Sequence, residues 1–360
     1  MTHDRLDEEE EFHAKNRKQS RKDRRHAQET DRSKFKKTDL KPKLSACDSS
    51  LPKGKVVAIS GEGAMVESAD GSRKLYSLKG LLKKEKMQAK NLIAVGDVVR
   101  MEADAICHVE ERTSYLSRQD ITGRKEQLIA VNIDQVLITA SVVSPPLKPA
   151  LVDRYIIAAK KGGMHPILLI NKIDLLNNAP DEHHRLFDAF MAAYEPLGFP
   201  ILSVSTQTGV GIEALRSLMN HKSSVFSGQS GVGKSSLINA AFGLSLKTGD
   251  LAQKTSKGSH TTSTAELLSL PGGGYCIDTP GVRSFGIWGL EKEDVKSHFM
   301  DLQEFAPECK FPDCTHIEEP RCAVQKALEE GLISNLRYES YRSLLAEAMQ
   351  DIDNWTRDKL

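Results

Sequence analysis

The stretch Gly228-Gln229-Ser230-Gly231-Val232-Gly233-Lys234-Ser235 fits the pattern G-x-x-x-x-G-K-[ST]. A β-like run at 224–226 precedes it and helix-forming residues at 236–241 follow it, which is the context that the pattern requires. In such a loop, backbone N–H groups converge on phosphate oxygens, and the following helix adds its positive end. We expect these eight residues and Ser236 to bind nucleotide phosphates. Lys234 is expected to act catalytically by bridging the β- and γ-phosphates, and Ser235 to ligate Mg²⁺.

A second motif indicates which base the nucleotide carries. The run Asn171-Lys172-Ile173-Asp174 ends an apolar strand, and its carboxylate can accept hydrogen bonds from both the ring N–H and the exocyclic amine of guanine. Asn171 can either satisfy the carbonyl side of guanine or brace the phosphate loop, while the stem of Lys172 can lie along the base. Ser205-Thr206, at the end of the next strand, would bring a backbone N–H to the guanine carbonyl. The nucleotide is therefore expected to be GTP.

A third motif, Asp278-Thr279-Pro280-Gly281, follows an apolar strand at 275–277. An aspartate at a strand end can hold Mg²⁺ through water, and the N–H of Gly281 can contact the γ-phosphate, so the loop after it would act as a switch. Thr261 or Thr262, in the polar stretch 254–264, can complete the Mg²⁺ shell. We favour Thr262, which is then both a magnesium ligand and a catalytic residue.

The order of the motifs is unusual, because an ordinary P-loop GTPase has its phosphate loop before its guanine motif. Here the guanine motif comes first, so the chain is circularly permuted. From residue 54 to its end it resembles the bacterial ribosome small-subunit-dependent, circularly permuted GTPases, on the motif 228–236, on His260-Thr261-Thr262 and on a cysteine cluster. The resemblance implies an α/β P-loop GTPase domain, preceded by a β-barrel OB-fold and followed by a helical zinc-binding domain. It also implies a monomer whose GTP hydrolysis is much faster on the small ribosomal subunit.

The cysteine cluster has the spacing of a metal site. Cys309, Cys314, His316 and Cys322 form C-x4-C-x-H-x5-C, and three thiolates with one imidazole match a closed tetrahedral zinc site. The spacing is also similar to the zinc site of the resembled family. Because protein ligands fill all four positions, one structural and non-catalytic zinc ion is expected.

Hydrolysis also requires a group that orients the attacking water. Val282 stands where many GTPases have glutamine, so that helper is absent. The resemblance implies that His260 takes this role, whereas the alternative is a solvent- or RNA-facing histidine. Ser259 departs from the family, in which an arginine commonly precedes the histidine, and this puts a phosphate or RNA contact in doubt. Gly231 replaces the asparagine of potassium-activated GTPases, so no strong potassium requirement is expected.

Composition and pattern divide the chain into four parts. Residues 1–45 are expected to be a basic disordered tail, because 15–43 holds thirteen Lys or Arg against four Asp or Glu and almost no apolar residues. Short β-like runs at 55–60, 64–67, 74–77, 97–101 and 105–109 predict an OB-fold at 46–112. Strands alternating with helices predict a mostly parallel sheet at 113–290, the GTPase domain. The helix-rich part at 291–360 surrounds the cysteines, and its last predicted helix spans 333–352.

The composition excludes several classes of protein. The 360 residues contain no apolar run long enough to span a membrane, and the charged start is unlike a secretory signal, so a cytoplasmic protein without a membrane partner is expected. The tail is either merely solvated or binds the small ribosomal subunit's rRNA, and the barrel either binds RNA or is a spacer. Two other functions remain open: a signalling GTPase with a protein partner, and an RNA-binding module with a passive nucleotide pocket.

Overall fold

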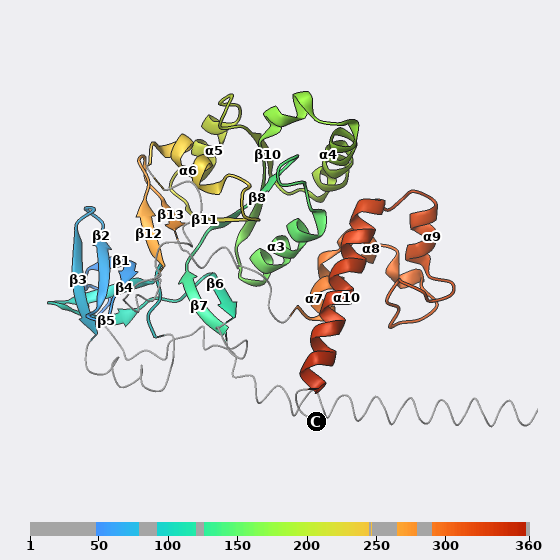
Figure 1. Ribbon diagram of the computed structural model, residues 1–360. Coiled ribbons are helices and arrows are strands. Elements are labelled where there is room, and N and C mark those ends of the chain that lie inside the picture. The colour runs from blue at the N-terminus through green and yellow to red at the C-terminus, as the bar shows by residue number, and fades with distance from the viewer. Residues whose placement is uncertain are drawn as a thin grey trace, which may run out of the picture. The chain divides into compact units, whose positions relative to one another are not determined.

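The computed structural model describes residues 48–78, 92–119, 126–244, 246, 265–278 and 290–357 (Figure 1). The chain divides into two units after Lys43, and every element below belongs to the second unit. The expected basic tail at 1–45 lies outside the described residues. Within the described ranges, no helix is long and apolar enough to cross a membrane.

The first five strands form a small barrel. They are β1 (Lys53–Ile59), β2 (Ala64–Ser68), β3 (Arg73–Leu78), β4 (Val98–Glu102) and β5 (Ala105–Val109). The pairing order is β1-β2-β3-β5-β4, and β4 pairs with β1 to close the sheet. Val56, Val66 and Val99 are fully buried inside it, because alternate side chains of a strand point to the same face. The predicted five-stranded, OB-like barrel is confirmed.

The central sheet also has the predicted character. Its strands are β8 (Gln135–Ser141), β9 (His165–Asn171), β10 (Ile201–Val204), β11 (Ser223–Ser227), β12 (Glu266–Ser269) and β13 (Tyr275–Asp278). They lie in the order β10-β9-β8-β11-β13-β12. Neighbours are parallel except for β12, which is antiparallel to β13. All residues of β8 are buried, as expected for a parallel sheet covered on both faces.

Helices cover both faces of this sheet. They are α3 (Pro149–Lys161), α4 (Asp181–Tyr194), α5 (Ile212–Met219) and α6 (Lys234–Phe242), and the 3-10 turns η1 (Ile173–Asn178) and η2 (Glu195–Leu197) lie in the connections. Ile138 of β8 belongs to the core that includes residues of α3 and α4. Its neighbour Leu137 belongs to the core that includes residues of α5 and α6. Because successive side chains of a strand point to opposite faces, the two pairs of helices lie on opposite sides of the sheet.

Two features of the sheet were not predicted from the sequence. Strand β1 pairs antiparallel with β12 at Ala58 and Glu266, so the described strands of the barrel and of the central sheet form one sheet of eleven. A separate hairpin of β6 (Tyr115–Gln119) and β7 (Glu126–Val131) follows the barrel. The four-residue strand β12 is too short to show a period in the sequence.

The C-terminal part is helical, as predicted. It comprises α7 (Lys292–His298), α8 (Met300–Gln303), η4 (Ala306–Glu308), α9 (Ala323–Glu329) and α10 (Asn335–Arg357). Phe299, Tyr341 and Leu345 are fully buried in its core. Ile157 of α3 belongs to the same core, so this region packs directly on a helix of the central sheet.

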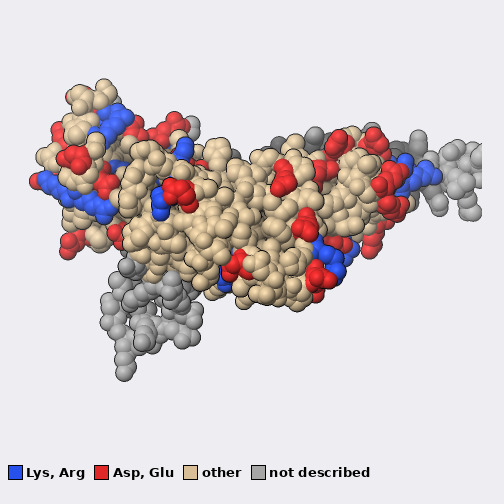
Figure 2. All heavy atoms as spheres, turned by 90° about the horizontal axis from the view of Figure 1, so that it is seen from above, with Lys and Arg blue, Asp and Glu red and all other residues tan. Residues whose placement is uncertain are grey.

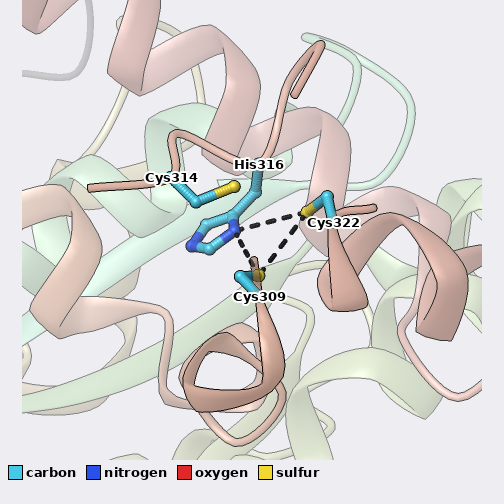
Figure 3. Close-up of side chains that lie close together, drawn as sticks. All are labelled: Cys309, Cys314, His316 and Cys322. Carbon is cyan, nitrogen blue, oxygen red and sulfur yellow. Dashed lines mark hydrogen bonds between the residues drawn. The ribbon is translucent and has the colours of Figure 1, made fainter. Parts of the chain in front are cut away.

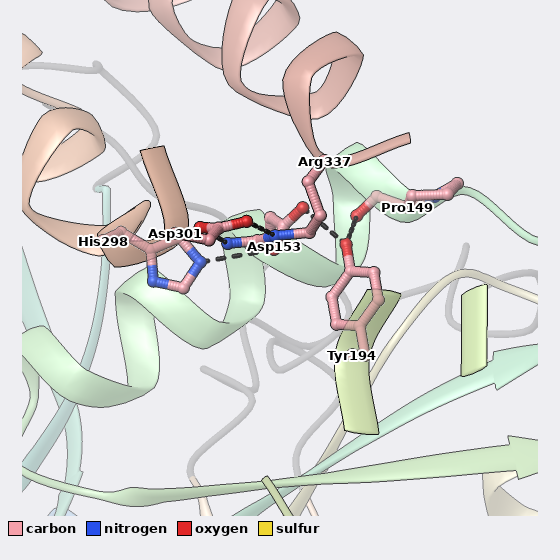
Figure 4. Close-up of polar contacts among 6 residues, drawn as sticks. All are labelled: Pro149, Asp153, Tyr194, His298, Asp301 and Arg337. Carbon is pink, nitrogen blue, oxygen red and sulfur yellow. Dashed lines mark hydrogen bonds and ion pairs between the residues drawn. The ribbon is translucent and has the colours of Figure 1, made fainter. Parts of the chain in front are cut away.

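A buried polar cluster joins the helical part to α3 and α4 (Figure 4). Asp153 of α3 accepts hydrogen bonds from Arg337 of α10 and, at 2.5 Å, from the hydroxyl of Tyr194. His298 Nε2 lies 3.2 Å from the same carboxylate. Arg337 also donates to both oxygens of Asp301, at 2.9 and 3.0 Å. Because these residues come from five different helices, α3, α4, α7, α8 and α10, the cluster ties them together.

Candidate functional site

The predicted phosphate loop connects β11 to α6. Gly228 has a φ of +137°, and a Cβ atom there would lie 2.1 Å from the carbonyl oxygen of Thr139. Gly233 has a φ of +95°, and a Cβ there would lie 2.5 Å from Nδ2 of Asn171. Glycine is required at both positions, because the backbone is left-handed and neighbouring strands approach it closely.

The start of α6 suits an anion. Lys234 Nζ donates to the carbonyl oxygens of Gly228 at 2.7 Å and of Gln229 at 2.8 Å, so its ammonium group lies against the loop. Ser235 and Ser236 follow in the first turn and are half-buried. That turn contains no acidic residue, so no carboxylate of this turn offsets the positive end of the helix dipole. These residues can offer a phosphate backbone N–H groups, hydroxyls and one cation.

The guanine motif holds the phosphate loop in place. Asn171 Nδ2 donates to the carbonyl oxygen of Val232 at 2.7 Å, which is the bracing contact that the sequence left as one of two alternatives. Lys172 has a φ of +61°. Its Nζ donates to the carbonyl oxygen of Gly231 at 2.7 Å and to that of Ser144 at 2.6 Å. Ser144 was not predicted to contribute, because no motif marks the loop after β8. The two motifs therefore form one connected structure.

The side chains expected to bind the base lie at adjacent strand ends. Asp174 lies just after the end of β9, and Ser205 just after the end of β10. The Ser205 hydroxyl donates a hydrogen bond to the Asp174 carboxylate. The same hydroxyl accepts from the backbone N–H groups of Gln207 and Thr208, both at 3.2 Å. Thr206 follows Ser205 in the chain and is half-buried. This arrangement presents a carboxylate next to a turn of backbone amides, which is the set of groups that the guanine edge requires.

Several predicted residues cannot be placed. Ser259, His260, Thr261 and Thr262 lie outside the described residues, as do Gly281 and Val282. The main chain of Asp278 ends β13, beside β11, but its side chain is not described. Of the expected Mg²⁺ ligands, Ser235 alone lies among the described side chains. The expected roles of the other residues therefore remain predictions.

The four predicted zinc ligands converge in the helical part (Figure 3). Their ligand atoms all lie within 4.8 Å of one another. Sγ of Cys309 and Sγ of Cys322 each lie 3.5 Å from Nδ1 of His316, and they lie 3.8 Å from each other. Ordinary zinc bond lengths place two sulfurs of a tetrahedral site about 3.8 Å apart, and a sulfur and a nitrogen about 3.6 Å apart. The cluster therefore has the dimensions to hold a zinc ion.

Surrounding residues hold the ligand loop. Tyr338 of α10 donates its hydroxyl to the carbonyl oxygen of His316 at 2.8 Å, and Lys296 donates to that of Cys314 at 2.6 Å. Glu319 accepts from the backbone N–H groups of Thr315 and Ile317. Burial alone would raise the pKa of Glu319, but the hydrogen bonds from Thr315 and the backbone lower it to about 2. These supporting residues were missed in the sequence, because none of them belongs to the Cys/His spacing.

The electrostatics of the cluster favour a cation. Burial raises the pKa of Cys314 to about 12 and raises that of Cys322 as well, so that neither thiol ionises easily without a positive partner. Burial lowers the pKa of His316, which keeps the imidazole neutral, as a metal ligand must be. A zinc ion would stabilise the thiolates and compensate for their burial. The chemistry of the donor set thus fits zinc.

Charges on the described barrel are largely paired. Figure 2 shows basic and acidic side chains interspersed on the face that it draws. Lys53 lies 3.1 Å from Glu110, and Lys74 lies 2.6 Å from Asp104. Paired charges produce a weak net field, so the barrel alone would attract nucleic acid only weakly. The concentrated positive charge of the sequence is in the basic segment at 15–43.

Comparison with known proteins agrees with this architecture. The RsgA GTPase family model matches residues 109–288. A small ribosomal subunit biogenesis GTPase RsgA from Chlorobaculum parvum is 39% identical over 308 residues, covering 81% of this chain and 96% of that protein. Its counterpart from Gemmatimonas aurantiaca is 41% identical over 304 residues, covering 81% of this chain and 97% of that protein.

Solved structures show the same fold. YjeQ from Thermotoga maritima is 31% identical with a TM-score of 0.66, covering 83% of this chain and 98% of that one. YloQ, a circularly permuted GTPase, is 27% identical with a TM-score of 0.62, covering 85% of this chain and 98% of that one. The permutation inferred from the motif order is therefore confirmed. On the family match, the long relatives and the shared fold, this chain belongs to the RsgA GTPase family and is a circularly permuted GTPase.

Proposed function

We propose that this chain hydrolyses GTP while bound to the small ribosomal subunit and serves there as a checkpoint late in assembly. The observation that carries the proposal is the contact of Asn171 and Lys172 with the phosphate loop, which unites both nucleotide motifs in one site. Relatives that match over nearly their whole length are named small ribosomal subunit biogenesis GTPases. The subunit stimulates the hydrolysis that then releases the protein.

The chemistry at the nucleotide is assigned to five groups. Lys234 neutralises charge on the β- and γ-phosphates, and Ser235 ligates the Mg²⁺ that accompanies GTP. Thr262 completes the Mg²⁺ shell, and Asp278 holds the ion through water. The backbone N–H of Gly281 contacts the γ-phosphate, so that loss of this phosphate releases the loop that follows.

The base and the attacking water have their own partners. Asp174 accepts from the two N–H donors of guanine, and Ser205 and Thr206 supply the amide for its carbonyl. His260 orients the attacking water, in place of the glutamine that Val282 replaces. Replacing His260 with alanine should reduce subunit-stimulated turnover and leave GTP affinity nearly intact; unchanged turnover would end this assignment.

The remaining parts of the chain hold the rRNA. The chain's proposed parts are the tail at 1–45, the OB-fold at 46–112, the GTPase domain at 113–290 and the zinc-binding domain at 291–360, and the tail, the OB-fold and the zinc-binding domain are those that hold the rRNA. One structural zinc ion on Cys309, Cys314, His316 and Cys322 shapes the last of these, since their distances and buried thiols suit it. The protein acts as a monomer in the cytoplasm. Sedimentation with and without subunits would detect a dimer, which would contradict the monomer.

The deciding experiment is GTP turnover with and without purified small ribosomal subunits. Lys234→Ala provides the control for contaminating hydrolases, because it removes the phosphate-binding cation. Stimulation by small but not by large subunits is expected. No stimulation would refute the checkpoint function and favour a protein activator. Zero turnover in all conditions, with GTP still bound, would indicate an RNA-binding module with a passive nucleotide pocket.

A further inference from the structure

The barrel is joined to the strands that lead to the nucleotide. Strand β12 pairs with β1 of the barrel on one side and with β13 on the other. Strand β13 in turn lies parallel to β11, with Tyr275 opposite Ser223. β11 runs into the phosphate loop, and β13 runs from Tyr275 to Asp278. Three residues of a strand span about 10 Å, so Tyr275 lies about that distance along β13 from Asp278, the end assigned to Mg²⁺.

Glu67 of β2 makes the main side-chain contact across this junction. Its carboxylate accepts from the hydroxyl of Tyr275 at 2.6 Å and from the hydroxyl of Ser269 at 3.0 Å. Arg73 of β3 donates to Glu67 at 2.8 Å and to Ser269 at 2.8 Å. The Glu67 side chain is 11% exposed. Both of its oxygens are engaged: the bond from Tyr275 is half-buried, whereas Arg73 and Ser269 are themselves exposed.

Lys55 of β1 holds the same strands from a second side. Its Nζ lies 4.6 Å from the centre of the Tyr275 ring and donates to the Ser223 hydroxyl at 3.2 Å. Burial lowers the pKa of Lys55, while the carboxylates of Asp134 and Glu67 oppose that shift. Burial and Glu67 raise the pKa of Tyr275 to about 12, so its hydroxyl remains a hydrogen-bond donor at neutral pH. Barrel side chains therefore contact Ser223, the first residue of β11, and Tyr275, the first residue of β13.

Within the described ranges, side-chain hydrogen bonds from β1, β2 and β3 to the central sheet join β11, β12 and β13. A shift of β13 relative to β11 would therefore strain the contacts of Glu67 and Lys55 with Tyr275. Packed polar contacts of this kind transmit small displacements, because interiors are not continuously deformable.

We propose that Glu67 and Tyr275 are positioning residues that couple the barrel to the nucleotide state. Exchanging GDP for GTP changes the stability of the barrel's attachment through β13, and a ligand held by the barrel changes the preference for GTP over GDP by the same factor. Couplings of this kind are typically about 5- to 150-fold. The part of the proposal that concerns the small ribosomal subunit rests on the proposed function above.

Hydrogen exchange in the free full-length protein tests the coupling without any subunit. Peptides covering Lys53–Leu78 would be compared with bound GDP and with a non-hydrolysable GTP analogue. In the wild type, we expect the exchange rates with GDP and with the analogue to differ about 5-fold or more. Tyr275→Phe, which removes one hydroxyl, and Glu67→Gln should each reduce that change several-fold. Tyr76→Phe, which removes a barrel hydroxyl outside this network, is the matched control and should keep it.

The outcomes separate the two proposals. Equal exchange with both nucleotides in the wild type, or a full response in Tyr275→Phe, would overturn the coupling whatever the subunit does. If Tyr275→Phe or Glu67→Gln bound GDP or the GTP analogue more than about 2-fold more weakly than the wild type, the residue would have a merely structural role. That result would also overturn the coupling. A second measurement compares subunit affinity with analogue and with GDP. An exchange response without any subunit binding would sustain the coupling and refute the proposed function.

Discussion

Replacing Arg337 with methionine tests whether the buried ion pair in Figure 4 holds the helical region on the central sheet. The side chains of Arg337 and Asp153 are 1% and 0% exposed, so water cannot replace either partner. The guanidinium lies 4.3 Å from the ring centre of Phe299 and 5.1 Å from that of Tyr194. A methionine side chain fits this space and packs well on aromatic rings. The variant therefore removes the charge with little loss of packing.

The expected loss follows from what Asp153 retains. Removing one partner of a buried ion pair costs about 3–5 kcal/mol, because the other group stays buried. Asp153 would keep the Tyr194 hydroxyl at 2.5 Å and His298 Nε2 at 3.2 Å. With these two contacts left, we expect the lower end, about 3 kcal/mol. Urea unfolding followed by circular dichroism, with zinc present throughout, would measure the shift of the midpoint at constant m.

Two further variants keep this reasoning open to refutation. Asp301→Asn removes the partly exposed partner of Arg337 and should cost about 1 kcal/mol. The double variant Asp153→Asn/Arg337→Met removes both charges and should be more stable than either single variant. A loss below about 1 kcal/mol for Arg337→Met, or single losses that simply add in the double variant, would refute the argument from buried charge.

Other predictions follow from the site. Gly228→Ala should abolish GTP binding in calorimetry, whereas Gly61→Ala, whose Cβ would meet open space, should not. Asp174→Asn should lose the binding of GTP and gain the binding of xanthosine triphosphate, which presents a carbonyl where guanine presents its amine. Zinc chelation, like Cys309→Ser, should reduce the helical circular dichroism. Burial lowers the pKa of His298, so the unfolded chain binds a proton more readily than the folded one. The free energy of unfolding of the wild type should therefore fall as the pH drops below about 6.5, by at most about 1.4 kcal/mol per pH unit. The fall should be smaller in His298→Gln.

The sequence predicted most of the elements that carry the site. The helix expected at 333–352 is α10, at Asn335–Arg357. The strands that end in the phosphate loop and in the guanine motif were also found. These elements have strong local signals, because apolar periodicity, glycine and cap residues act over a few positions. Strand β12 and the β6–β7 hairpin were missed, because short or irregular runs have no such period.

The sequence by itself indicated the chemistry that is proposed for this protein. Phosphate binding, guanine recognition and zinc ligation each require particular residue types at short spacing, and the order of the motifs alone indicates the permutation. The tertiary structure decided how the parts are joined. Glu67 meets Tyr275 across 208 positions of the chain, and Asp153 meets Arg337 across 184. No spacing marks such pairs, because only the folded backbone brings distant side chains within hydrogen-bond distance and removes the water between them.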